Sequence, residues 1–184
     1  IVRAHDVLQG GYIWDFADQS LRWPVPNGEG TYLAYGGDWG DDPNDGNFCA
    51  NGVVTADRGL NGKAAEVKHV YQDILLSSDD PSSGRVTITN EHLFTDVSAY
   101  AGSWELVADG EVVESGELTR QQLSVPPSSS ATITVPFTKP ANPAPGSEYF
   151  LRLSFTTRDD TLWADAGFEV AKHQFPVDVG SPEV

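Results

Sequence analysis

The sequence predicts a mixed fold in two parts, an incomplete α/β unit followed by an antiparallel β-sandwich. Residues 1–76 show the order strand, long loop, strand, helix, which is typical of a parallel α/β unit. Residues 85–175 show short alternating runs and no helical pattern, which is typical of a sandwich. Residues 77–84 between them are Ser, Asp, Pro and Gly, the composition of a linker. We therefore expect two separate domains.

The first part contains few regular elements. Residues 11–16 and 52–56 are short apolar runs, so each predicts a buried strand. Residues 19–52 are rich in Pro, Gly and Asp and predict a long loop. Apolar residues recur at helical spacing from Ala64 to Leu75, which predicts a helix. Two strands and one helix cannot close a core, so this part is expected to need strands from elsewhere.

The second part is predicted to be all β. Alternating apolar and polar residues predict strands over residues 85–89, 103–107, 111–113, 116–118, 131–135, 149–155 and 168–175. Asp109-Gly110 lies between two of these runs and is the signal of a two-residue hairpin turn of type I′. Residues 176–184 are rich in Pro, Gly and acid, and predict the start of another linker.

Composition and charge exclude several functional classes. A net charge of −16 argues against partners such as nucleic acid and anionic membrane surfaces, which attract Lys and Arg clusters. No apolar run is long enough to predict a membrane span. The single cysteine, Cys49, excludes an internal disulfide framework. Because the chain starts at Ile1 and contains no Met, we expect it to be a fragment of a longer gene product.

The segment most indicative of function is Tyr35–Gly52, which is dense in Gly, Asp, Asn and aromatic residues. Such a segment predicts an irregular loop, and rigid loops of this kind commonly hold a ligand. A calcium loop is excluded by its spacing. If Asp41 is the first position, Pro43 occupies the third and Gly52 the twelfth, where the ion needs oxygen ligands.

This loop, together with the motif GGYIWDFADQS at residues 10–20, resembles the sugar-site loop and preceding barrel strand of the large bacterial β-galactosidases in glycoside hydrolase family 2. Residues 85–94 and 161–174 resemble the first and last strands of the domain that follows the barrel. The resemblance implies the remnant of a (β/α)8 barrel, comprising its last two strands and final helix, followed by an immunoglobulin-like β-sandwich. The chain departs from the family at residues 59–63, where prolines are usual, and at Trp39, where Phe is frequent.

The resemblance implies a set of site residues in the first part. Trp14 would form an aromatic wall of the galactose pocket. Asn51 would contact the primary hydroxyl of the sugar and a sodium ion, and the backbone carbonyl of Phe48 would be another sodium ligand. Asn44 and Asp45 would support the region of a magnesium ion whose own ligands lie outside this chain.

The chemistry of these side chains suits such roles, although it leaves structural alternatives open. An aromatic ring offers a rigid apolar face, and an amide offers one acceptor and two donors. From position alone, however, Trp14 could equally be a barrel-core residue, and the alternative for Asn51 is an ordinary turn residue.

The remaining polar residues of the first part are expected to be structural. Asp15, Asp18 and Asp38 are predicted to accept hydrogen bonds from loop N–H groups. Asp57 and Arg58 are predicted to form a buried ion pair. Cys49 is predicted to be a small buried hydrophobe.

No catalytic residue is predicted in this chain. Retaining glycosidases need two carboxyl groups at the scissile bond. Glu29 lies in a turn and Glu66 on the predicted helix, and no Glu matches the catalytic motifs of the family. The chain alone is expected to be inactive.

The parent enzyme is expected to hydrolyse terminal non-reducing β-D-galactosides in the bacterial cytoplasm. Its remaining domains are the expected partners of this chain, and the parent is expected to be a homo-oligomer. Two alternatives stay open at this point: a non-catalytic sandwich that acts as a spacer or interaction module, and another exo-glycosidase specificity of the same family.

Overall fold

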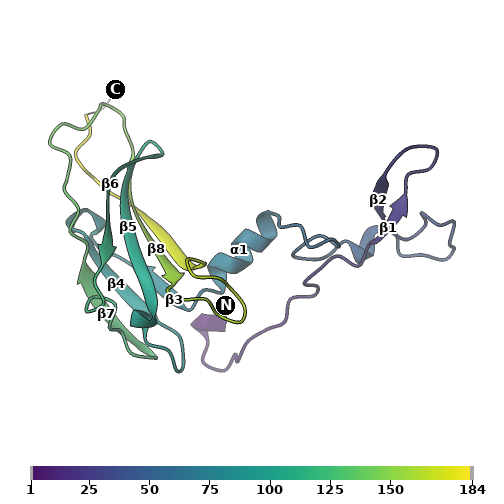
Figure 1. Ribbon diagram of the computed structural model, residues 1–184, viewed down its shortest axis with the longest axis horizontal. Helices are drawn as coiled ribbons and strands as arrows, with labels where there is room; N and C mark the ends of the chain where they lie inside the picture. The colour runs from purple at the N-terminus through teal and green to yellow at the C-terminus, as the bar shows by residue number, and fades with distance from the viewer. Residues whose placement is uncertain (1, 183–184) are drawn as a thin grey trace. The chain divides into compact units, whose positions relative to one another are not determined.

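The computed structural model describes residues 2–182, which divide into two compact units at Val70 and Tyr71 (Figure 1). No helix in this range is long and apolar enough to cross a membrane. The elements in chain order are η1 (Val2–Ala4), β1 (Leu21–Pro24), β2 (Thr31–Ala34), η2 (Gly46–Cys49), α1 (Gly62–Val70), β3 (Ile74–Ser77), η3 (Pro81–Ser83), β4 (Arg85–Asn90), η4 (Val97–Ala99), β5 (Tyr100–Ala108), β6 (Glu111–Leu118), β7 (Ser129–Thr134), β8 (Tyr149–Thr157) and β9 (Glu169–Pro176).

The second unit is a β-sandwich, as predicted. Its two sheets have the strand orders β3-β4-β7 and β6-β5-β8-β9, and every pairing is antiparallel (Figure 1). In β8 the burial alternates from residue to residue, because successive side chains of a strand point to opposite faces. The turn between β5 and β6 has φ of 48° at Asp109 and 94° at Gly110, the two positive values that a type I′ turn requires.

The core of the second unit draws on both sheets. Ile74 and Ile88 from one sheet and Leu106, Leu151 and Phe155 from the other belong to one cluster, and each is at most 1% exposed. Full burial of one such side chain contributes about 1.5–3 kcal/mol to folding. The sandwich therefore has a core of its own, built from residues after Val70.

The predicted helix over residues 64–75 is too long. Helix α1 starts after Asn61, whose side-chain Oδ1 accepts hydrogen bonds from the N–H groups of Lys63 (3.0 Å) and Ala64 (3.3 Å), and it ends at Val70. The next apolar residues form β3, which pairs with β4 and becomes an edge strand of the sandwich. An apolar run this short is compatible with both the helical and the strand period. Pairing with β4 decides that it forms a strand. The division between the units at Val70 thus precedes the predicted domain limit at residue 76.

The first unit contains less regular structure than predicted. Residues 11–16 are not a strand, and the predicted strand at 52–56 is reduced to one parallel bridge, between Ala17 and Val54. The predicted loop at 19–52 includes a hairpin of β1 and β2. A strand needs a partner for its backbone groups, and the described residues supply only a short one, between residues 15–18 and 53–54. The arrangement is that of a barrel remnant without a closed barrel.

We predict that Ile74→Ala lowers the free energy of unfolding of the sandwich by about 2–5 kcal/mol, because it leaves a cavity between the sheets. Leu75→Ala is the matched control, since its side chain lies on the other face of β3 and is only half-buried. Urea unfolding followed by circular dichroism measures both. Equal losses would contradict the placement of β3, because a helix would put both side chains on one apolar stripe.

Candidate functional site

The loop after β2 is held by hydrogen bonds between its own residues. The Asp38 carboxylate accepts from the N–H of Tyr35 (2.9 Å), and the Asp41 carboxylate accepts from the N–H of Gly37 (2.9 Å). The N–H of Gly36 donates to the carbonyl of Gly46 (3.0 Å), which joins the start of the loop to the first residue of η2. The high content of Gly, Asp and Asn thus produces a fixed loop, as expected for a ligand-holding segment.

Gly52 lies at the closest approach between the two chain segments of the site. Its N–H donates to the Asp18 carboxylate (2.7 Å), and a Cβ at position 52 would lie 2.1 Å from the Asp18 backbone nitrogen. Next to it, the N–H of Val53 donates to the Asp15 carbonyl (3.0 Å) and the N–H of Val54 to the Phe16 carbonyl (2.9 Å). Only glycine fits at this position, because the two backbones are in contact.

This contact brings together the two segments that carry the predicted sugar ligands. Trp14 directly precedes Asp15, and Asn51 directly precedes Gly52, so the two residues flank the same backbone ladder. The Trp14 side chain is 79% exposed and does not pack in a core of the described residues. An exposed indole face is available to an apolar sugar surface.

Asn51 has an unsatisfied polar atom. Its side-chain Oδ1 is buried and has no hydrogen-bond partner within residues 2–182. Such an orphaned acceptor is uncommon in a folded protein, because burial without a partner costs about 1–3 kcal/mol. The atom is therefore a candidate for contact with a ligand donor, a cation or a further protein segment.

Phe48 lies in the short helix η2, three residues before Asn51. The carbonyls on either side of it accept hydrogen bonds: that of Asn47 from the N–H of Ala50 (2.9 Å), and that of Cys49 from the N–H of Gln19 (2.9 Å). These bonds fix the backbone at Phe48, while its ring is mostly exposed. The turn of η2 thus sets the direction of the Phe48 carbonyl.

Asn44 and Asp45 are placed in the same loop. The Asn44 amide donates to the Asp41 carbonyl (2.8 Å), and its Oδ1 accepts from the N–H of Gly46 (3.0 Å). Asp45 precedes η2, and its carbonyl accepts from the N–H of Phe48 (3.2 Å). Asn44 thus shapes the loop, and any role of these residues near a magnesium ion stays a prediction.

The three aspartates that we expected to be structural acceptors have that role. Asp15 accepts from the N–H of Phe16 (2.6 Å) and from the side chain of Gln19 (2.5 Å). Asp18 accepts from Gly52, and Asp38 from Tyr35, as described above. Their carboxylates are engaged by loop donors, so the expectation is confirmed.

The predicted pair between Asp57 and Arg58 is wrong. Asp57 instead pairs with Arg22 of β1 at 2.7 Å, and both side chains are about half exposed. The Arg58 guanidinium donates to the Ala56 carbonyl (2.8 Å). The Thr55 hydroxyl, which donates to Asp57 (2.6 Å), and the Arg22 guanidinium lower the pKa of that carboxyl below its ordinary value. The prediction relied on the adjacency of Asp57 and Arg58 in sequence, whereas the actual partner of Asp57 lies 35 residues away.

Two further contacts tie the hairpin to the loop and were not anticipated. The rings of Trp23 in β1 and Trp39 in the loop meet edge to face, with centroids 5.9 Å apart. The hydroxyl of Ser20 lies 3.7 Å from the sulfur of Cys49, which is only partly buried, whereas we expected a small buried hydrophobe. The only signal in the sequence was the presence of two tryptophans in a loop-rich segment.

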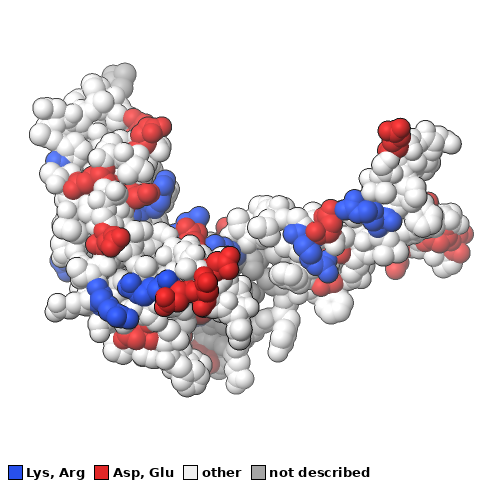
Figure 2. Space-filling view, viewed as in Figure 1, with Lys and Arg blue, Asp and Glu red and all other residues white. Residues whose placement is uncertain are grey.

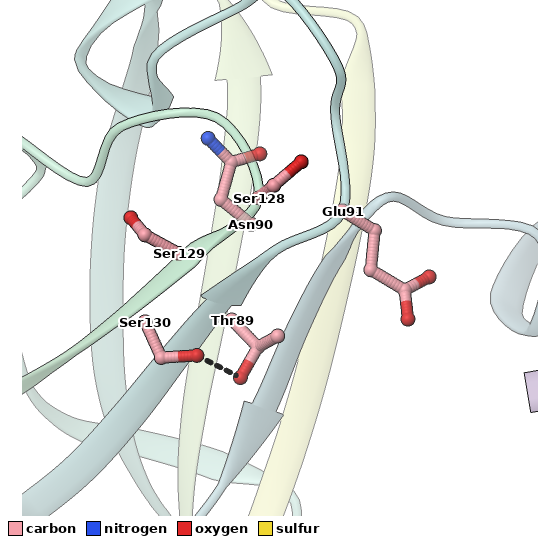
Figure 3. Close-up of a pocket in the computed structure, with 6 residues that line it drawn as sticks. All are labelled: Thr89, Asn90, Glu91, Ser128, Ser129 and Ser130. Atoms are coloured by element: carbon pink, nitrogen blue, oxygen red, sulfur yellow. Dashed lines mark hydrogen bonds between the residues drawn. The ribbon is translucent and has the colours of Figure 1, made fainter.

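A hollow that is not part of this loop lies on the sandwich (Figure 3). It measures about 450 Å³ and is lined by Thr89, Asn90, Glu91, Ser128, Ser129 and Ser130. The hydroxyls of Thr89 and Ser130 bond to each other (3.0 Å), and the Asn90 amide is engaged by the carbonyls of Thr95 and Val125. This hollow has no aromatic wall, so the candidate site stays in the first unit.

Charge distribution does not mark a second site. Basic side chains occur in small separate groups on the face shown in Figure 2. Within residues 2–182, no three His, Cys, Asp or Glu side chains are grouped so that they could hold a metal ion.

Comparison with known proteins matches both parts of the chain. Residues 1–76 match the family model "Glycosyl hydrolases family 2, TIM barrel domain", and residues 86–178 match "Beta-galactosidase, domain 4". A β-galactosidase of Priestia megaterium is 41% identical over 98% of the chain, one of Streptococcus thermophilus 41% over 95%, and one of Klebsiella pneumoniae 38% over 95%. The chain spans 16–17% of the length of these relatives.

We predict that Gly52→Ala opens the contact between the two site segments, since the added methyl would overlap the Asp18 backbone. Overpacking of this kind costs about 1–3 kcal/mol or more. Hydrogen exchange of the Asp18, Val53 and Val54 amides measures the opening and should become faster. Gly62→Ala is the control, because a Cβ there meets open space. Unchanged protection in Gly52→Ala would contradict the close approach.

Proposed function

The chain belongs to glycoside hydrolase family 2, and from this premise we propose that it is part of a retaining β-galactosidase that hydrolyses terminal non-reducing β-D-galactosides. The relatives named above are described as β-galactosidases, and they match both units in one continuous order. Because the chain spans about a sixth of their length, the activity belongs to a longer protein. The chain supplies binding groups to that protein.

The observation that carries this proposal is the unsatisfied Asn51 oxygen next to the exposed Trp14 segment. A galactose ring presents one apolar face and several hydroxyls. Trp14 would cover the apolar face, and Asn51 would bind the primary hydroxyl. A site with a buried polar group discriminates strongly, because a ligand without the matching group leaves it unpaired.

A sodium ion fits the oxygens available here. Hard cations prefer neutral and anionic oxygen ligands, and two neutral oxygens are available here: the Phe48 carbonyl in η2 and Asn51 Oδ1, two residues after the end of η2. When bound, the ion would polarise and orient an oxygen of the sugar. Asn51 would then hold both the ion and the hydroxyl, which fixes the ring against Trp14. Magnesium would be bound by residues outside this chain.

The proposal assigns no catalytic residue to these 184 residues. A retaining enzyme needs a nucleophilic carboxylate and an acid/base carboxyl about 5–5.5 Å apart. In the first unit the two glutamates, Glu29 and Glu66, lie in the β1–β2 turn and on α1, far apart in sequence and outside the ladder. We therefore propose that both catalytic groups come from elsewhere in the enzyme and that the chain alone is inactive.

One observation favours a second role for residues after Val70. The sandwich has its own core, and fold alone does not imply catalysis. A non-catalytic spacer or interaction role for this unit is compatible with the binding role of the first. Another exo-glycosidase specificity of the family is the remaining alternative, and hydrolysis of β-mannosides but not β-galactosides would establish it.

We predict that Asn51→Ala in the full-length gene product lowers kcat/KM for a β-galactoside by about 10- to 100-fold, which corresponds to the loss of a hydrogen bond to a buried polar group. It should also abolish the stimulation by added Na⁺. Asn47→Ala in the same loop is the control and should retain both, because only the backbone of Asn47 is used. Full activity and unchanged Na⁺ response in Asn51→Ala would exclude this residue from the site.

We predict that Trp14→Ala weakens galactoside binding more than Trp14→Phe, since Phe retains an apolar ring face. Competitive inhibition by galactose in the full-length product measures this, with a higher inhibition constant for Ala than for Phe. Because the side chain is exposed within this chain, neither substitution should unfold it. Equal constants for the wild type and Trp14→Ala would show that Trp14 is not part of the sugar pocket.

A further inference from the structure

One end of the sandwich presents large apolar side chains to solvent. The β4–β5 connection carries Leu93 and Phe94, which are 71% and 92% exposed, and the β8–β9 connection carries Leu162 and Trp163, which are 108% and 64% exposed. The two connections meet at the same end, because Tyr100 at the start of β5 pairs with Thr157 at the end of β8. Exposed apolar groups gathered in this way mark interaction surfaces.

The β8–β9 connection is held in one conformation by its own hydrogen bonds. Thr161 and Ala164 exchange bonds through the Thr161 hydroxyl (2.9 and 3.0 Å) and through the Thr161 N–H (2.8 Å). The Thr157 hydroxyl donates to the Asp165 carbonyl (2.7 Å) and accepts from the N–H of Phe168 (3.0 Å). The loop thus presents Leu162 and Trp163 on a pre-formed turn, which lowers the entropy cost of docking.

Two contacts support the turn from its neighbours. The Trp163 and Phe168 rings meet edge to face, with centroids 5.6 Å apart. The Arg158 side chain donates to the Ser98 carbonyl (3.3 Å), which joins the β8–β9 connection to the β4–β5 connection. The two connections therefore form one surface, which we call the end patch: Leu93, Phe94, Leu162, Trp163 and Phe168.

We propose that the end patch docks on another domain of the same polypeptide, at a surface that is apolar in its centre and basic at its rim. This inference rests on the proposed function, in which the chain is part of a longer enzyme. The relatives are about six times as long as the chain, and a (β/α)8 barrel takes about 250 residues, so the 76 residues that match the barrel model leave most of that domain outside. The longer polypeptide therefore contains further folded domains whose surfaces could cover the end patch.

Acidic residues beside the end patch indicate which charges the rim of the partner surface should carry. Asp159, Asp160 and Asp165 lie in the β8–β9 connection, and the one basic residue of that connection, Arg158, is engaged by Ser98. Basic side chains on the partner would complement these carboxylates. A saccharide is a weaker candidate, because Leu162 offers no hydrogen bond and the nearby Thr161 hydroxyl is used within the turn.

Hydroxyl-radical footprinting read by mass spectrometry tests the proposal. The full-length gene product is compared with the 184-residue chain, residue by residue. We expect oxidation of Phe94, Leu162 and Trp163 to be several-fold slower in the full-length product. Val112 and Val113 are the control, because they are about half exposed on β6, beside the other end of β5, and should be oxidised alike in both proteins.

A double variant tests whether protection reflects a stabilising contact. Leu162→Ser with Trp163→Ser should lower the thermal midpoint of the full-length product and leave that of the 184-residue chain nearly unchanged. The matched control is Val112→Ser with Val113→Ser, which should alter neither. Equal shifts in the two proteins would mean that the patch acts only within the sandwich, and would overturn the proposal.

Three other results would also overturn it. Equal oxidation in both proteins would show that the patch stays free. Protection of the 184-residue chain that rises with its concentration would identify a second copy as the occupant. Protection of the full-length product only after addition of lactose would identify a saccharide. A β-galactosidase assay on the same preparation separates the two proposals, since protection without activity would refute the proposed function alone.

Discussion

The contact between Gly52 and Asp18 is the constraint on which the candidate site depends. It is the point where the backbone of the Tyr35–Gly52 loop touches the segment after Trp14, at a separation that admits no side-chain carbon. From there the parallel bridge at Ala17 and Val54 sets the register. Moving the register by one residue would move Asn51 away from Trp14, so the binding groups depend on a backbone contact.

The two units differ in what stabilises them. The sandwich buries side chains from both of its sheets in one cluster, and this burial provides its free energy of folding. The first unit depends on hydrogen bonds within the Tyr35–Gly52 loop, on the Trp23–Trp39 contact and on the Arg22–Asp57 pair, which is about half exposed and therefore contributes little. Local bonding of this kind fixes the conformation of a loop. The exposed apolar side chains of the first unit need further strands to bury them.

Local patterns predicted the sandwich well and the first unit only in part. Period-two alternation located β4 to β9 and the Asp109-Gly110 turn, because neighbouring strands are present in the same chain. The same reasoning failed at Leu75, where pairing with β4 overrides a helical pattern, and at residues 11–16, where only Asp15 and Phe16 bond to a neighbouring segment. Asp57 pairs across 35 residues, and no local pattern indicates such a partner. The residue types of the site could be predicted from the sequence. That the Asn51 oxygen is buried and unsatisfied is known only from the structure.

A crystal structure of the full-length gene product with galactose and Na⁺ tests the central claim most directly. The account predicts the apolar face of the sugar against Trp14, its primary hydroxyl on Asn51, and the cation on Asn51 Oδ1 and the Phe48 carbonyl. Both catalytic carboxylates should come from outside residues 1–184. Galactose bound in contact with neither Trp14 nor Asn51 would contradict the account, whatever the activity of the enzyme.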